Sequence, residues 1–288
     1  MHDSVSVIVN VYHKDNPLHF FDALDSILKQ TQKPSIVLIV SDGVLTQDLY
    51  EVVDTFVNEH EWFRYYETQE NLGVWAAKNY ALTLVDTLIV AYLDADDIMH
   101  PRRIELQTDF LTSQELDICG TAAIKFTNDS RVINHRRLRQ NLVNTGEFFN
   151  NPIINSSLMM LTKTFFTIGE YRKVYCQEDY DFAIRAVSKN LLISNLDIAL
   201  SAFRINDDFY KRRGGLKFIK SEYDIYNARK KLKIYKPWGL SVFTFRLVFR
   251  LMPSILRKLY YRTNVDWSEL HYRDLSGWRE AKNPGAHI

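Results

Sequence analysis

The sequence predicts an α/β fold in which a mostly parallel β-sheet is covered by helices on both faces. Short runs of apolar, largely β-branched residues recur along the first hundred residues, and segments with helical spacing separate them. The runs are apolar throughout rather than alternating, which is typical of parallel strands buried on both faces. A chain of 288 residues, 46% of them hydrophobic, is long enough to bury such a core. We therefore expect a Rossmann-like sheet flanked by helices.

The expected elements follow in order along the chain. Strands are predicted over 5–9 (VSVIV), 36–40 (IVLIV), 63–67 and 88–93 (LIVAYL). Helices are predicted over 18–30, near 47–58 and over 73–84. The second half is less regular, with strands near 118–126, 157–161 and 198–203 and a helix over 179–189.

Polar side chains follow three of the predicted strands. Ligands bind beyond the carboxyl ends of the strands in open α/β sheets, so these side chains are expected to line one crevice. They are Asn10, Tyr12, Asp42, Asp94, Asp96 and Asp97. Two acids one residue apart, such as Asp94 and Asp96, can meet one hard cation that prefers oxygen ligands. Acidic residues at strand ends are also often solvated turn residues, and the pair alone does not decide between the two.

The net charge of +1 hides two parts of opposite sign. Residues 1–200 hold 17 basic and 27 acidic side chains, net −10, whereas residues 201–288 hold 19 and 8, net +11. Within 240–262, Arg246, Arg250 and Arg257 fall within about 40° on a helical wheel, and Pro253 breaks or kinks the segment. A basic end of this kind favours an anionic partner such as phosphate, nucleic acid or an acidic membrane surface.

Eight segments stand out in order along the chain. They are VSVIVNVYHK (5–14), DSILKQT (25–31), VSDG (40–43), ENLGVWAAKN (70–79), YLDADDIMHPRRIELQ (92–107), IGEYR (168–172), CQEDYDFAIRAV (176–187) and FRINDDFYKRRGG (203–215). This series resembles family 2 glycosyltransferases of the GT-A fold, the inverting enzymes that include many bacterial O-antigen and capsule transferases. The resemblance covers residues 4–215.

The resemblance implies a nucleoside diphosphate sugar, usually UDP-linked, as the donor. By position in the family's motifs, Asn10, Tyr12 and Asp42 would hold the nucleotide, with Asp42 on the uracil or ribose. Tyr12 could equally be a packed aromatic. Gly73 would permit a close backbone approach before a helix N-terminus, which favours anions. Lys78 stands where the family usually has arginine, so it would keep the positive charge toward the donor but not a bidentate contact.

The resemblance also gives the D-x-D motif a role. Asp96 would ligate Mn²⁺ or Mg²⁺ through the diphosphate of the donor, and Asp94 would touch the ribose or belong to the metal site through its water shell. The cation would neutralise negative charge on the departing UDP. Asp97 would orient the donor sugar, or instead cap a helix beginning near Pro101.

The acidic pair Glu178-Asp179 matches the family's E-D motif. Asp179 would act as the general base that takes the proton of the acceptor hydroxyl, while Glu178 would help to position acceptor or donor. Attack from the opposite face would give a β-linkage from an α-linked donor. Further along the resemblance, Ser156 would contact the acceptor, and Arg212 and Arg213 would belong to a basic segment over the diphosphate.

The resemblance and the charge split together predict the organisation of the chain. Residues 1–215 would form the GT-A domain, with a nucleotide-sugar half over 1–110 and an acceptor half over 111–215. Residues 216–288 would form a basic, mainly helical amphipathic extension that attaches to an anionic membrane surface. The N-terminus lacks the basic start of a signal peptide, and no uncharged apolar run is long enough to span a membrane. We therefore expect a cytoplasmic protein, peripheral on the cytoplasmic face of the inner (plasma) membrane.

The expected reaction is transfer of a hexose from a UDP-sugar to a glycan, linked to a lipid diphosphate, of O-antigen or capsule synthesis. One alternative is a phosphohydrolase of the haloacid dehalogenase type, because L-D-A-D-D-I loosely resembles its nucleophile loop. Another is a non-catalytic membrane or nucleic-acid binding module built around the basic end. No nucleic-acid partner is expected, since the acidic body disfavours a nucleic-acid groove.

Overall fold

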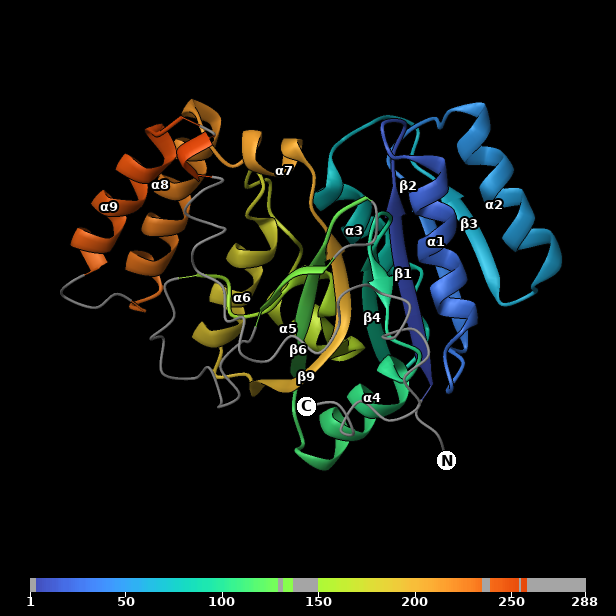
Figure 1. Cartoon of the computed structure of the whole chain (residues 1–288). Helices are drawn as coiled ribbons and strands as arrows, with labels where there is room; N and C mark the ends of the chain where they lie inside the picture. The colour runs from blue at the N-terminus through green and yellow to red at the C-terminus, as the bar shows by residue number, and fades with distance from the viewer. Residues whose placement is uncertain (1–3, 129–131, 137–149, 235–238, 254, 258–288) are drawn as a thin grey trace.

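The computed structural model describes residues 4–128, 132–136, 150–234, 239–253 and 255–257, and it confirms the α/β fold class (Figure 1). Its strands are β1 (Val5–Val11), β2 (Ile36–Ser41), β3 (Phe63–Glu67), β4 (Ile89–Asp94), β5 (Ile98–Met99), β6 (Ile118–Phe126), β7 (Val132–Arg136), β8 (Met159–Leu161) and β9 (Ile193–Arg204). Its helices are α1 (Pro17–Leu28), α2 (Gln47–Glu59), α3 (Val74–Thr83), α4 (Arg103–Ser113), η2 (Asn155–Ser157), α5 (Thr162–Ile168), α6 (Glu178–Ser188), α7 (Asp207–Lys211), α8 (Leu216–Lys231) and α9 (Gly239–Leu251).

These strands form one mixed sheet in the order β3-β2-β1-β4-β8-β6-β9-β5, with β7 paired to β6. The first four run parallel, which confirms the parallel sheet expected of the continuous apolar runs. β8 then pairs antiparallel with both β4 and β6, so the second half is mixed. The strand predicted over 157–161 is shorter than expected, because Ser157 belongs to the 3-10 helix η2 and the strand begins at Met159.

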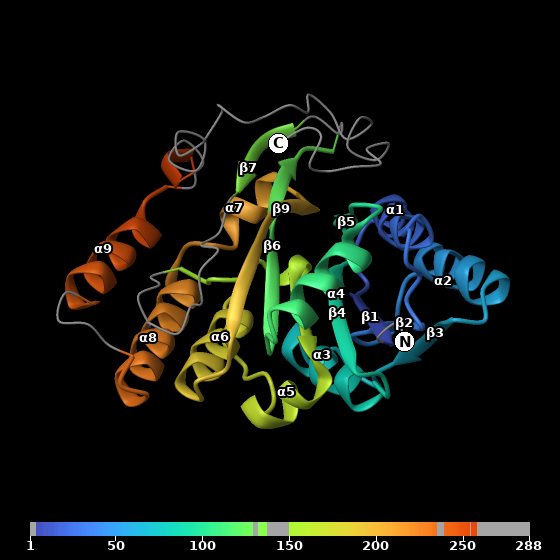
Figure 2. The ribbon, with the colours of Figure 1, turned by 90° about the horizontal axis from the view of Figure 1, so that it is seen from below.

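Helices cover both faces of the sheet. Successive residues of a strand point to opposite faces, so β1 sends Val7 and Val9 toward one face and Ile8 toward the other. The first face packs on α1, α2 and α4, and the second on α3, α5 and α6. Figure 2, seen from below, shows α1, α2 and α4 on one side of the strands and α3 and α5 on the other.

The two described C-terminal helices, α8 (Leu216–Lys231) and α9 (Gly239–Leu251), are packed onto the rest of the protein rather than standing apart from it. Ile225 of α8 is buried in the same core cluster as α3 and α6. α9 lies beside α8, and the rings of Tyr226 and Phe243 stack with centroids 4.4 Å apart (Figure 1). The boundary predicted at residue 215 therefore does not coincide with a break in the core. Within the described residues, the longest apolar helix still falls short of what a membrane crossing requires.

Candidate active site

The ends of neighbouring strands bring the predicted polar residues together. Asn10 of β1 pairs in register with Asp94 of β4 on one side and with Val40 of β2 on the other. The Nδ2 group of Asn10 is buried and has no hydrogen-bond partner in the part of the chain that the structure describes. A buried donor without a partner costs free energy unless something accepts from it. Asn10 thus offers a free donor beside the D-x-D motif.

A continuous chain of polar contacts joins the two acidic motifs. Asn155 of η2 donates from Nδ2 to Asp94 Oδ1 at 2.7 Å and accepts from Lys78 Nζ at 2.9 Å. Lys78 of α3 also forms an ion pair with Glu178 at 2.9 Å. Four elements that are distant in sequence thereby hold the D-x-D motif next to the E-D motif.

Asp179 is the more open member of the E-D pair. Its Oδ2 accepts from Asn151 Nδ2 at 2.7 Å and its Oδ1 from the backbone N–H of Tyr180 at 2.8 Å, while the side chain is only half-buried. Burial, and then the neighbouring Glu178, raise the pKa of Asp179 to about 6, against the opposing effect of Lys78. A carboxylate with a pKa just below neutrality is ionised at pH 7 and still basic enough to accept a proton.

Acidic side chains also crowd the strand ends. Asp15 approaches from the loop after β1, where its Oδ2 accepts from the backbone N–H of Tyr12 at 2.9 Å. Burial is the largest cause that raises the pKa of Asp15 to about 7, and the charges of Asp96 and Asp94 raise it further. The pKa values of Asp94 and Asp96 are likewise raised, first by burial. This concentration of negative charge favours a cation.

The donor set fits a cation that is shared with a phosphate ligand. Among the described residues, no three His, Cys, Asp or Glu side chains gather as a ready-made metal site. Magnesium-type ions are commonly held by one or two carboxylates together with substrate phosphates, so Asp96 and Asp94 are sufficient for that mode. Mn²⁺ or Mg²⁺ remains a prediction for this site.

The basic segment after β9 approaches the same acidic cluster. Arg212 is exposed, and its positive charge opposes the effect of burial that raises the pKa of Asp96. Arg213 instead packs over the ring of Phe209, 3.6 Å from its centroid, and donates to the carbonyl of Phe209 at 3.2 Å. Arg212 is therefore the better placed of the two for an anionic ligand.

Three of the predicted contact residues are buried among protein groups, and their contacts with donor or acceptor stay predictions. Lys78 is 1% exposed, with its ammonium between Glu178 and Asn155 rather than open to a donor. Asp97 is 4% exposed, and it accepts from the backbone N–H of Arg204 at 2.9 Å. Asp97 does not cap α4 either, because that helix begins at Arg103 with no side-chain cap.

Ser156 is the third of these residues. It is 2% exposed, and its side chain hydrogen-bonds Asp97. Its carbonyl accepts from the fully buried Arg103 at 2.6 Å. Ser156 therefore contacts other buried residues of the protein. Its half-buried neighbour Asn155 is the residue that contacts the D-x-D motif.

Asp42 organises the loop before α3. Its carboxylate accepts from the backbone N–H groups of Leu72 and Gly73, at 2.8 and 2.9 Å. Gly73 has φ +100°, a backbone conformation that other residues rarely adopt, which bears out the need for glycine there. The predicted contacts of Asp42 and of the 37% exposed Tyr12 with a nucleotide stay predictions.

Sequence reasoning missed Asp15, Asn151 and Asn155 as site residues. Asp15 follows a polar stretch that looks like a solvated loop, and nothing local signals that its carboxylate turns back toward β4. The asparagines were within reach, since both shortly precede the predicted acceptor residue Ser156, and Asn155 is next to it. An asparagine is amide donor and acceptor at once, the property that lets Asn155 join a carboxylate to an ammonium.

The sequence matches the family described as glycosyl transferase family 2 over residues 6–172. The UDP-Gal:alpha-D-GlcNAc-diphosphoundecaprenol beta-1,3-galactosyltransferase of Escherichia coli is 28% identical over 273 residues, which cover 89% of this chain and 94% of that protein. The amylovoran biosynthesis glycosyltransferase AmsE of Erwinia amylovora is 27% identical over 259 residues, or 89% and 97% of the two chains.

The fold is shared with a solved glycosyltransferase structure. The crystal structure of S. aureus TarS 1-349 in complex with UDP-GlcNAc matches with a TM-score of 0.65 and 16% identity, over 92% of this chain and 77% of that one. At this identity the likeness speaks for the fold alone. The family match, by contrast, covers more than half of the sequence and includes the D-x-D motif. The chain therefore belongs to glycosyl transferase family 2 and is a glycosyltransferase that uses a sugar-nucleotide donor.

Proposed function

We propose that this protein is an inverting, metal-dependent transferase that moves a hexose from a UDP-sugar to a hydroxyl of a lipid-diphosphate-linked glycan in bacterial surface polysaccharide synthesis. The observation that carries the proposal is the polar chain from Asp94 through Asn155 and Lys78 to Glu178. These contacts hold the D-x-D motif close to Glu178 and therefore to the next residue, the half-buried Asp179. A base at Asp179 and a leaving group at the D-x-D motif can then act on the same sugar.

The proton and the electron pairs move in a single displacement. The acceptor oxygen attacks the anomeric carbon, while Asp179 takes the hydroxyl proton. The bond from that carbon to the diphosphate oxygen breaks, and UDP departs with the electron pair. Since the attack comes from the face opposite UDP, an α-linked donor gives a β-linked product and no covalent sugar-enzyme species forms.

On the donor side, the residues of the strand ends bind and orient the UDP-sugar. Asn10 has a free donor for the nucleotide, and Arg212 supplies positive charge above the acidic cluster. Asp96 and Asp94 would hold Mn²⁺ or Mg²⁺, which supplies charge neutralisation for the diphosphate as it leaves. Lys78 acts within the protein, where its ion pair at 2.9 Å holds Glu178 in place.

The acceptor and its location rest on the relatives and on the C-terminal helices. The E. coli relative is named for a diphosphoundecaprenol acceptor, and the E. amylovora relative for amylovoran biosynthesis. α9 exposes an apolar face to solvent, and exposed lysines lie along α8 beside it. Apolar side chains next to lysines suit an anionic membrane surface, where such an acceptor resides. The residues of that face are Leu240, Phe245, Val248, Leu251 and Met252.

This mode of membrane contact differs from the one expected of the sequence. Arg246 and Arg250 of the predicted basic stripe point into the protein, so they are not offered to a membrane. Family membership also replaces the phosphohydrolase alternative. The apolar face of α9 and the exposed lysines of α8 are the surface that would contact the membrane.

A donor panel tests the proposed reaction. The full chain is incubated with UDP-Glc, UDP-Gal, UDP-GlcNAc or UDP-GalNAc and a synthetic sugar-diphosphate-lipid acceptor, with and without Mn²⁺. We expect transfer from at least one donor, dependent on the cation, with a β-configured product by NMR. An α-configured product, or full activity after chelation, would refute the corresponding part of the proposal.

A further inference from the structure

The arginine stripe of the basic end is turned inward. Arg246 and Arg250 of α9, and Arg257 after it, are all partly or fully buried. Their guanidinium groups meet carboxylate and carbonyl oxygens of the protein, including the carbonyls of Tyr210 and Arg213 on the basic segment after β9. The side of α9 that the charge pattern singled out is thus its contact side, and the apolar side is exposed.

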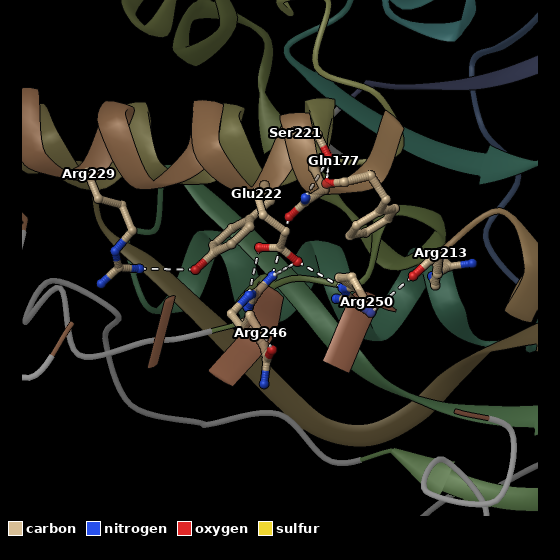
Figure 3. A network of polar contacts seen from close by, with 10 residues as sticks. Gln177, Arg213, Ser221, Glu222, Arg229, Arg246 and Arg250 are labelled. Atoms are coloured by element: carbon tan, nitrogen blue, oxygen red, sulfur yellow. Dashed lines mark hydrogen bonds and ion pairs between the residues drawn. The ribbon is translucent and has the colours of Figure 1, made fainter. Parts of the chain in front are cut away.

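Glu222 of α8 is the centre of these contacts (Figure 3). Its side chain is 1% exposed. The guanidinium of Arg246 donates two hydrogen bonds to this carboxylate, from Nε to Oε2 at 2.7 Å and from Nη2 to Oε1 at 2.9 Å. Arg250 adds a bond from Nε to Oε1 at 3.0 Å. A bidentate contact of this kind fixes the orientation of the guanidinium as well as its distance from the carboxylate.

While bound to Glu222, Arg246 also contacts two residues near the E-D motif, Gln177 and Asn150. Its Nη2 lies 3.4 Å from the Oε1 of Gln177, the residue before Glu178, and Gln177 is also bound to Ser221 of α8 at 2.8 Å. Its Nη1 donates to Asn150 Oδ1 at 3.2 Å. The next residue, Asn151, donates to Asp179.

The turn that enters α6 depends on such outside support. Cys176 has φ +52°, and Gln177, at the N-cap, makes no side-chain capping bond. A residue other than glycine in the left-handed region is strained and persists when its surroundings hold it. The contacts of Gln177 with Arg246 and Ser221 come from the two C-terminal helices, so these helices hold the start of α6.

We propose that Arg246 is a positioning residue for the general base: anchored on Glu222, it fixes Asn150-Asn151 and Gln177 on either side of Asp179. This role rests on the proposed function of Asp179. It gives the C-terminal helices a part in the chemistry, because α9 determines where the base carboxylate stands against the acceptor. The charged groups that face Asp179 itself are Glu178, Lys78 and Asp94, and Arg246 acts through neutral side chains.

Kinetics of Arg246 variants of the full chain test the proposal. We expect Arg246→Gln to lower kcat by about 10- to 100-fold, the effect of a misplaced catalytic group, with the KM for the donor changed by less than about threefold. If the hydrogen bond from Asn151 to the carboxylate weakens, the acid limb of the kcat profile shifts to higher pH, because that bond stabilises the charged form. The kcat of Arg246→Lys should be intermediate, since an ammonium cannot form the bidentate contact with Glu222.

Two further variants separate positioning from stability. Arg185→Gln removes a buried arginine of α6 that pairs with Asp181 at 2.8 Å and donates to the carbonyl of Ile168, contacts that the positioning role does not use. It should lower the melting temperature, and leave kcat and the pH profile of the folded enzyme unchanged. The double variant of Arg246→Gln with Asn151→Ala should be no slower than the slower single variant by more than about threefold, because both changes break one route.

The outcomes also distinguish this inference from the function on which it rests. An unchanged kcat and acid limb in Arg246→Gln, or multiplicative losses in the double variant, would overturn the positioning role. If Asp179→Asn is inactive while Arg246→Gln transfers normally, only the positioning role is wrong. If Asp179→Asn transfers normally, the assigned base is wrong and the positioning role falls with it.

Discussion

Asp179 and Glu178 are adjacent in sequence and differ in what surrounds them. Glu178 is 8% exposed and is neutralised by Lys78, whereas Asp179 is more open and hydrogen-bonded to a neutral amide. Asp179 is thus the more accessible of the two carboxylates, and burial raises its pKa to about 6. The structure thus supports the choice of Asp179 over Glu178 on environment, which the sequence motif could not supply.

The pH dependence of transfer follows from the environment of Asp179. Its pKa is raised to about 6, so the carboxylate is protonated, and unable to accept a proton, below that value. We expect kcat to fall as the pH decreases through about 6 and to level off above it. A rate profile from pH 5 to 8 with saturating donor checks this, and a kcat that stays constant down to pH 5 would contradict it.

Arg212 and Arg213 should differ in a matched pair of variants. Arg212 is exposed and faces the acidic cluster, while Arg213 is stacked on Phe209. We expect Arg212→Gln to raise the KM for the UDP-sugar by about tenfold, the loss of one charged hydrogen bond to a phosphate. Arg213→Gln should change it less than about threefold. Equal effects of the two changes would contradict the assignment.

At this scale the sequence named the acidic residues and misjudged the burial of their neighbours. The motif order identified Asp94, Asp96 and the E-D pair. It could not show that Lys78 is buried, because burial of a lysine depends on a partner such as Glu178 of α6. Asp15 was missed for the same reason, since only the folded loop carries its carboxylate to the others.

Among the elements, the strands of the first half were the most predictable. β3 has the predicted bounds, and β1, β2 and β4 differ from the predicted bounds by one or two residues at one or both ends. In the second half, β6 also has its predicted bounds. Continuous apolar runs mark buried strands reliably. β8 was less predictable, because Ser156 and Ser157 before it form the 3-10 helix η2 instead of extending the strand. The side chain of Ser156 there hydrogen-bonds Asp97.

α9 shows why a helical wheel alone assigns the wrong face. The pattern grouped the arginines correctly, but the predicted attachment to an anionic surface requires them to be exposed. Glu222, which neutralises two of them from inside, lies on another helix, 24 and 28 residues away. Buried arginines require such partners, and a helical wheel contains no information about them.

The apolar face of α9 provides a test of membrane contact. We expect the triple change Phe245→Ser, Val248→Ser and Leu251→Ser to reduce flotation with anionic vesicles by at least about fivefold, since each change removes apolar area. The rate with a water-soluble acceptor should not change. Undiminished flotation would exclude this face, and the control triple change Lys217→Gln, Lys220→Gln and Lys230→Gln shows how much of the binding is electrostatic.

For the whole molecule, the division of charge does not match a division of the core. Residues 201–288 are net +11, yet their described helices close the core over α6 and neutralise part of that charge internally. The polarity of the chain was readable from its sequence. The sharing of one core by α6 and α8 was not, because it depends on a few apolar contacts such as Ile225.

A truncation tests this shared core. A chain that ends at residue 215 loses Ile225, and it leaves the buried Gln177 without its Ser221 partner. We expect it to be insoluble, or to lack a cooperative thermal transition by circular dichroism, because exposed core surface and unsatisfied polar groups both destabilise it. A soluble 1–215 chain that melts cooperatively near the temperature of the full chain would restore the boundary first expected at 215.

The most direct test of the proposed mechanism is the behaviour of Asp179→Asn in two assays on one preparation. Calorimetry measures binding of the UDP-sugar with Mn²⁺, and a transfer assay measures turnover with the lipid-diphosphate acceptor. Because asparagine keeps the shape of the side chain and cannot accept the proton, we predict donor affinity within about threefold of the unaltered protein and a loss of transfer of at least about 10²-fold. A variant that binds the donor and transfers sugar at an undiminished rate would contradict the account.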